Sequence, residues 1–169
     1  MSVVTILGLD PGLRHTGWGV IRVTGNRLSY VAAGTVNPVA TLPMAQRLAV
    51  LAKALAHIIA LHDPDEAVVE ETFVNGNARA ALKLGQARGI ALMAPALAGL
   101  PVAEYAANLI KKSVTGYGHA DKQQVQTMIQ ILVGGISDKL AIDAVDALAI
   151  AVCHAHHRQT MAWTQQVRA

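Results

Sequence analysis

The sequence has one cysteine, Cys153, and few charged residues, and both scarcities narrow the class of protein. A single cysteine excludes an internal disulfide and makes a thiolate metal cluster implausible. Charged residues form 15% of the chain and hydrophobic residues 53%, a balance that excludes a disordered or tail-like protein. The 169 residues are enough to bury one continuous core.

Long apolar runs, targeting signals and repeats are missing as well. The longest apolar candidate, residues 90–102, is broken by Pro95, Gly99 and Pro101 and is too short to span a bilayer. No basic residue precedes the apolar run at the N-terminus, so we expect no secretory signal, no membrane association and a cytoplasmic location. Without repeats or a long linker, we expect a single domain over residues 1–169, with its core at about 3–157 and a short C-terminal tail.

The charges that are present make the chain mildly basic. Lys and Arg number 14 against 11 Asp and Glu, which gives a net charge of +3 and a pI near 9.2. This balance helps a protein approach a polyanion, but many proteins without such a partner are equally basic. The positions of the charges therefore carry more information than their sum.

Hydrophobic patterns predict strands in the first part of the chain and mostly helices afterwards. Three strand-like runs, separated by the turn signals at residues 10–12 and 25–26, predict an antiparallel meander. Later runs with helical spacing alternate with two short strand-like runs. The predicted strands cover residues 3–9, 16–23, 27–36, 67–71 and 102–105, and the predicted helices cover 43–62, 77–97, 107–113, 121–132 and 139–157. This order indicates an α/β fold with a mixed five-stranded sheet flanked by helices, and it also suits sugar kinases and other actin-like ATPase domains.

Four acidic residues stand where they are expected to point into the protein. Asp10 and Glu70 each close an apolar strand, and Asp143 and Asp146 lie three residues apart on one face of an otherwise apolar helix. Buried acids are rare unless they are paired or bound to a metal, and four of them together would repel one another. Divalent cations such as Mg²⁺ take oxygen ligands, and two such ions suit phosphoryl chemistry. The set therefore predicts a metal-dependent phosphoryl-transfer or hydrolysis site.

Each acid also has a plainer interpretation. Asp10 could belong to an ordinary turn, Glu70 could be a solvated strand end like its neighbour Glu71, and the helical pair could be a polar stripe. The four acids in combination favour the metal site over these plainer interpretations. An actin-like phosphotransferase would need a second glycine-rich phosphate loop and usually a longer chain, and the sequence offers neither. Intact acids also argue against a silent DNA-binding module, because uncompensated carboxylates repel phosphates.

Four segments carry a specific resemblance. They are residues 6–20, 69–89, 114–122 and 143–149, and the string Leu-Lys-Leu-Gly-Gln-Ala-Arg-Gly at 82–89 is the most specific part. In unbroken order from Ile6 to His154, they resemble the motifs of RuvC-type Holliday junction resolvases. Glu71 stands where relatives often have Gln, and the motif alignment favours Glu70 as the metal ligand.

The resemblance implies an RNase H-like fold, a homodimer, and paired symmetric nicking of four-way DNA junctions in recombination and DNA repair. It makes Asp10, Glu70, Asp143 and Asp146 the catalytic ligands of Mg²⁺, with two ions per site and Mn²⁺ as a substitute. It also implies a branch-migration motor complex as partner. The alternative is a related RNase H-like nuclease that acts on RNA or on other branched DNA.

Several basic residues are candidates for DNA contact. By resemblance, Lys111 and Lys122 contact DNA or stabilise charge in the transition state, and Lys122 follows Asp121, a predicted helix cap beside which a phosphate can bind. The alternative for both lysines is an ordinary solvated surface. Lys83 and Arg88 are either DNA-facing or structural, and the sequence does not separate the two roles.

Three further features have two interpretations each. Phe73, the only phenylalanine, is by resemblance a residue that stacks on an unpaired base, whereas a loop phenylalanine is more often a core plug. Gly85 and Gly89, one helical turn apart, permit a close dimer contact or packing on the sheet. The histidines at 154, 156 and 157 resemble metal ligands, but without partners nearby in the sequence they predict a frayed polar helix end.

Overall fold

The computed structural model describes residues 2–72, 76–137 and 139–167, with side chains described as far as Arg158. Its elements are β1 (Val3–Asp10), β2 (Thr16–Thr24), β3 (Arg27–Val36), α1 (Met44–His62), β4 (Glu66–Glu71), α2 (Ala78–Leu97), β5 (Val102–Ala106), α3 (Ala107–Thr115), α4 (Lys122–Leu132) and α5 (Ile142–Val167). The predicted α/β fold, a single domain with a mixed five-stranded sheet, is confirmed.

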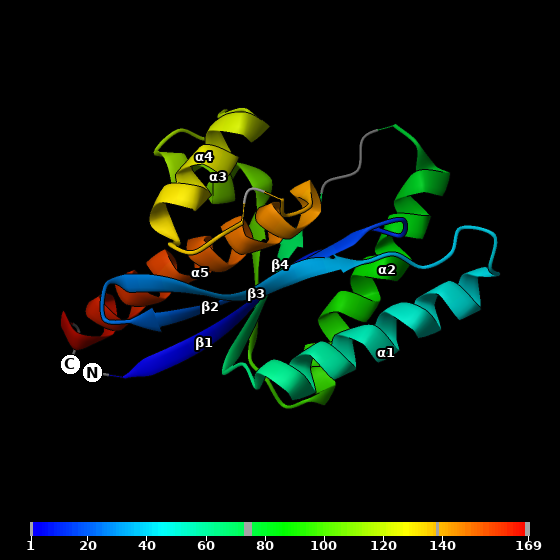
Figure 1. Cartoon of the computed structure of the whole chain (residues 1–169), viewed down its shortest axis with the longest axis horizontal. Coiled ribbons are helices and arrows are strands. Elements are labelled where there is room, and N and C mark those ends of the chain that lie inside the picture. Colours follow the sequence, from blue (N-terminus) through cyan, green and yellow to red (C-terminus); the bar gives the residue numbers. More distant parts are fainter. Residues whose placement is uncertain (1, 73–75, 138, 168–169) are drawn as a thin grey trace.

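The sheet has the strand order β3-β2-β1-β4-β5. The first three strands form the antiparallel meander, while β4 pairs parallel with β1 and β5 pairs parallel with β4. Helices α3, α4 and α5 cover one face and α1 and α2 cover the other (Figure 1). Alternation along β1 buries Ile6 toward α5 and sends Leu7 and Leu9 toward α1 and α2, so the chain has one core on each side of the sheet.

Glycines in β1 and β2 let α5 lie directly on the sheet. A Cβ atom on Gly8 would lie 2.1 Å from the Ala147 carbonyl oxygen, and one on Gly17 would lie 1.9 Å from that of Asp143. Gly17 pairs with Asp10 across the ladder. The missing side chains therefore bring the start of α5, with its acidic residues, beside the end of β1.

Helix α1 is long and apolar enough to cross a membrane by length and composition, with a mean hydropathy of 1.4. In the fold, however, Leu51, Leu55 and Ile58 are buried in the core between the sheet and α2. The core helices of globular proteins pass the same composition test. Arg47 and Lys53 on the same helix are consistent with this position in a globular domain.

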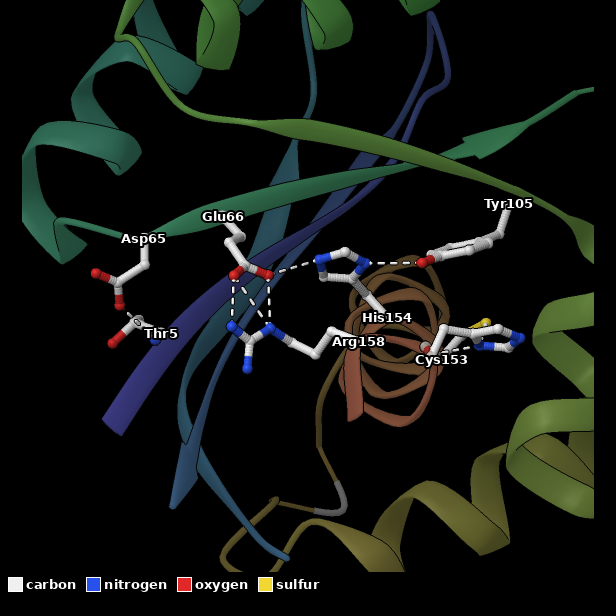
Figure 2. Close-up of polar contacts among 8 residues, drawn as sticks. Thr5, Asp65, Glu66, Tyr105, Cys153, His154 and Arg158 are labelled. Atoms are coloured by element: carbon white, nitrogen blue, oxygen red, sulfur yellow. Dashed lines mark hydrogen bonds and ion pairs between the residues drawn. The ribbon is translucent and has the colours of Figure 1, made fainter. Parts of the chain in front are cut away.

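The prediction of a frayed helix end at the histidines is wrong. Glu66 accepts hydrogen bonds from Arg158 at 2.7–3.0 Å, and its Oε2 lies 2.8 Å from His154 Nε2 (Figure 2). Because a carboxylate only accepts, Nε2 donates and Nδ1 accepts from the Tyr105 hydroxyl at 3.0 Å. His154 is only 9% exposed, and α5 continues to Val167, beyond the predicted helix end at residue 157. Contacts from β4 and β5, remote in the sequence, hold the turns of α5 around His154 and Arg158.

Candidate active site

Asp10 and Glu70 meet at the ends of two adjacent strands. The parallel register pairs Leu9 with Val69, so the next residues, Asp10 and Glu70, are side by side. Glu70 shares the α5 face of the sheet with Val68, whereas Glu71 belongs to the other face and is exposed. Geometry therefore agrees with the choice of Glu70 over Glu71.

Helix α5 adds two carboxylates to this edge of the sheet. Ligand oxygens of Asp10, Asp143 and Asp146 all lie within 4.8 Å of one another, and the three residues are half-buried. Asp10, Glu70 and Asp146 also line a common cavity of about 270 Å³. The four acids thus converge from β1, β4 and α5, although they are up to 136 positions apart in sequence (146 − 10).

Burial and mutual repulsion disfavour charge on these acids. Burial raises the pKa of Asp10 to about 7, with further contributions from Glu70, Asp146 and Asp143. Burial is likewise the main cause of the raised pKa of Glu70 and of Asp146, while Lys122 opposes the shift at all three groups. A divalent cation would relieve this repulsion, and the hard oxygen donors fit Mg²⁺ or Mn²⁺.

Two lysines face the acids from α3 and α4. Lys111 and Lys122 line the cavity, and Lys122 Nζ lies 3.4 Å from Asp146 Oδ2. The Lys122 side chain remains 74% exposed, so this contact contributes little to stability and leaves the cation accessible to an anion. Asp121 caps α4 in a capping box with Gln124, as the sequence predicted, and this cap fixes the first turn that carries Lys122.

Arg88 and Lys83, both on α2, occupy different environments. The Arg88 guanidinium forms an ion pair with Glu104, and its Nε donates to the backbone carbonyl of Glu70 at 3.3 Å. This arrangement favours the structural interpretation of Arg88, as a residue that holds the end of β4. Lys83 is exposed and lines a separate groove that borders Asp143.

The remaining candidates divide between described and undescribed parts of the chain. Gly85 and Gly89 are exposed, and a Cβ atom on either would meet no described residue outside its own turn of α2 within 4 Å, which excludes packing on the sheet. Phe73 lies outside the described residues. Sequence reasoning missed Arg14 and Arg47, which line the groove with Lys83. The sequence did carry a signal for both: Arg14 stands in the turn after Asp10, and Arg47 stands in the first turns of the predicted helix at 43–62.

Carboxylates from two strand ends and a covering helix, with lysines opposite them, form a group that could hold a divalent cation beside a bound anion. Residues 6–154 match the family model described as Crossover junction endodeoxyribonuclease RuvC. The protein of that name from Rhodopseudomonas palustris (strain TIE-1) is 59% identical over 155 residues, which cover 92% of this chain and 88% of the relative.

Solved structures agree with the sequence match. Thermus thermophilus RuvC superposes with a TM-score of 0.84 at 30% identity, covering 92% of this chain and 96% of that one. T. thermophilus RuvC in complex with Holliday junction substrate gives a TM-score of 0.86 at 29% identity, with 93% and 96% covered. The chain belongs to the RuvC family of crossover junction endodeoxyribonucleases.

Proposed function

We propose that this protein cuts four-way DNA junctions by paired symmetric nicks, through Mg²⁺-dependent hydrolysis of phosphodiesters, in recombination and DNA repair. The observation that carries the proposal is the convergence of Asp10, Asp143 and Asp146 within 4.8 Å, in a chain of this family. The complex of the Thermus relative with its junction substrate supports the choice of DNA.

Different residues of the site would bind the metal ions and the phosphate. Asp10, Glu70, Asp143 and Asp146 would hold two Mg²⁺ ions, which supply the Lewis acidity for hydrolysis and which Mn²⁺ can replace. Lys111 and Lys122 contact the scissile phosphate from the opposite wall of the cavity and neutralise the charge that develops on it. Arg88 positions Glu70 through its backbone carbonyl, and this bond supports a structural role.

A homodimer is the proposed functional unit. The solvent side of α2 carries an apolar stripe in which Leu82, Met93 and Leu97 are 68%, 44% and 78% exposed, and Gly85 and Gly89 lie between them. Glycines at this spacing allow a second helix to approach closely. Two subunits related by a two-fold axis would present one cavity to each of two symmetric strands.

Phe73 is proposed to stack on an unpaired base at the junction centre. Its support is the sequence resemblance together with the described flanks of its loop, because β4 ends one residue after Glu70 and α2 begins at Ala78. The family further supports a branch-migration motor complex as partner and a cytoplasmic location, where chromosomal DNA is accessible in a bacterium.

Incubation with labelled four-way, three-way and linear DNA and with an RNA–DNA hybrid, each with Mg²⁺ and with a chelator, tests the function. We expect symmetric paired nicks in the four-way substrate, only when Mg²⁺ is present. Equal cutting of three-way DNA or of RNA hybrids would replace the junction resolvase by a broader RNase H-like nuclease. No cutting of any substrate with Mg²⁺ or Mn²⁺ would contradict the nuclease itself.

A further inference from the structure

A second concave surface adjoins the acidic cluster. It is a groove of about 540 Å³ between the turn after β1, the first turns of α1 and the first turns of α2. Asp143 borders this groove, while Asp10 and Asp146 line the cavity with the two lysines. Since the oxygens of these three acids lie within 4.8 Å of one another, the cluster separates two neighbouring depressions.

The groove has a strong excess of positive charge. Arg14, Arg47 and Lys83 line it, against the single carboxylate of Asp143 at its edge. Arg14 and Lys83 are exposed, and within the described part of the chain neither takes part in an ion pair. Three like charges that share one groove favour an anion as ligand.

Arg47 is fixed in place before any ligand arrives. One of its terminal nitrogens donates to the Leu13 carbonyl at 2.9 Å, and its Nε is buried without a hydrogen-bond partner among the described residues. A buried donor left unpaired destabilises the folded state. A charged group kept at that cost, beneath a groove with two further cations, points to a role in holding an anion.

The turn that carries Arg14 is also well ordered. The buried Thr16 hydroxyl donates to the Gly12 carbonyl at 2.6 Å and accepts from its N–H at 3.3 Å. His15 Nδ1 lies 2.9 Å from the side-chain oxygen of Asn37, whose amide nitrogen donates to Thr35. A preformed turn lowers the entropic cost of binding.

We propose that this groove binds a backbone phosphate that flanks the scissile phosphate on the strand being cut. Arg14 and Lys83 make the direct contacts, and Arg47 supplies charge from beneath. The inference rests on the proposed function, because only a DNA strand that passes over the acidic cluster brings successive phosphates to both depressions. A strand held on both sides of the cluster would keep the scissile phosphate in register with the carboxylates.

The salt dependence of junction binding tests this groove. Arg14→Ala/Lys83→Ala should bind a four-way junction about tenfold more weakly in chelator at about 0.1 M NaCl, and its slope of log K against log salt should be smaller by about 2. The matched control is Arg27→Ala/Lys53→Ala, which removes two exposed cations from the far end of the β2–β3 ladder and from further along α1. An equal loss in the control variant, or an unchanged slope in the groove variant, would overturn the inference.

A scan with neutral methylphosphonates then locates the phosphate. In the wild type, one position beside the cut site should weaken binding when neutralised, and the groove variant should become insensitive at that position alone. The same pattern in both proteins would overturn the assignment. If the groove variant binds the junction as the control variant does, while the wild type binds and cuts four-way DNA, only the proposed role of the groove is refuted. A wild type that neither binds nor cuts refutes the proposed function as well.

Discussion

At the scale of single residues, environment distinguishes chemically similar acids. Glu70 and Glu71 are adjacent, yet one faces a cavity with other carboxylates and the other faces outward. Asp10 is the extreme case, because burial and three acidic neighbours raise its pKa to about 7. Without a metal, such a group destabilises the folded protein whenever it is charged.

Replacing Asp10 by Asn should therefore stabilise the metal-free protein at pH 8. A pKa raised from 3.8 to about 7 imposes a cost that is fully present above pH 7 and disappears as the pH falls below the unfolded value. At pH 8 in chelator, we expect the free energy of unfolding of Asp10→Asn to exceed that of the wild type by a few kcal/mol, and its melting temperature to be higher. Near pH 4 we expect no difference.

With Mg²⁺ bound, the wild type should become more stable than Asp10→Asn. Saturating Mg²⁺ should raise the melting temperature of the wild type, since a ligand that binds only the folded state stabilises it, and should leave Asp10→Asn nearly unchanged. Calorimetry with and without Mg²⁺ measures both effects. Equal stabilisation of the two proteins would remove Asp10 from the metal site.

Phe73 provides a second test at this scale. If it stacks on an unpaired base, Phe73→Ala should weaken junction binding by about 1–3 kcal/mol and slow junction cutting, with little effect on binding to linear duplex. Fluorescence anisotropy with both substrates measures the difference. Equal losses on junction and duplex would refute the stacking role.

At the scale of elements, the position of α5 determines the site. Its first turns bring Asp143 and Asp146 to the ends of β1 and β4, over the glycines at 8 and 17. Its later turns are anchored by Glu66, which bonds to Arg158 and His154. The first turns of the helix and the turns around His154 and Arg158 are therefore held by different means, by close packing at the former and by charge at the latter.

The charged anchor makes stability depend on pH. Burial alone would raise the pKa of Glu66, but hydrogen bonds from Arg158 and His154 outweigh it and lower the pKa. A lowered acid pKa contributes stability above the unfolded value of 4.5, and this stability is lost as the pH falls through the folded value. Glu66→Gln should cost about 2 kcal/mol at pH 7 and less at pH 3, below the unfolded value.

Urea denaturation at the two pH values measures this difference. Asp65→Asn, which alters the exposed neighbour bonded to the Thr5 N–H at 2.7 Å, is the matched control and should show a smaller cost. A Glu66→Gln cost that does not change between pH 7 and pH 3 would contradict the ionic character of the anchor.

Local patterns in the sequence predicted nearly all the elements. Alternation and helical periodicity depend on neighbours in the chain, so the five strands and the order of the helices followed from them. The acidic residues of α5 stood out because their surroundings were apolar. Patterns of this kind do not report long-range contacts, so the partners of His154 and the groove formed by Arg14, Arg47 and Lys83 were missed.

At the scale of the whole molecule, one cavity is not enough to cut two strands symmetrically. The exposed stripe on α2 offers the surface on which a second copy can pack. Gly89→Glu places a charged side chain in the middle of that stripe, where an added Cβ atom would meet no described residue beyond its own turn of the helix within 4 Å. We expect the wild type to be a dimer and Gly89→Glu to be a folded monomer that makes unpaired nicks.

Sedimentation velocity and a cruciform plasmid assay, which separates nicked from linear products, check the two parts of this prediction. Lys53→Glu, an exposed charge change on α1, is the control and should remain dimeric. A dimeric Gly89→Glu protein would exclude this face of α2 as the interface.

The central claim is that the inward-facing carboxylates, and not acidity in general, make this molecule a junction nuclease. The most direct measurement compares four-way junction cleavage in Mg²⁺ by Glu70→Gln and Glu71→Gln, which differ by one position and by the face of the sheet. We predict that Glu70→Gln cuts at least about 1,000-fold more slowly while it still binds the junction, and that Glu71→Gln cuts like the wild type. Full cutting by Glu70→Gln, or equal losses in the two variants, would contradict the account.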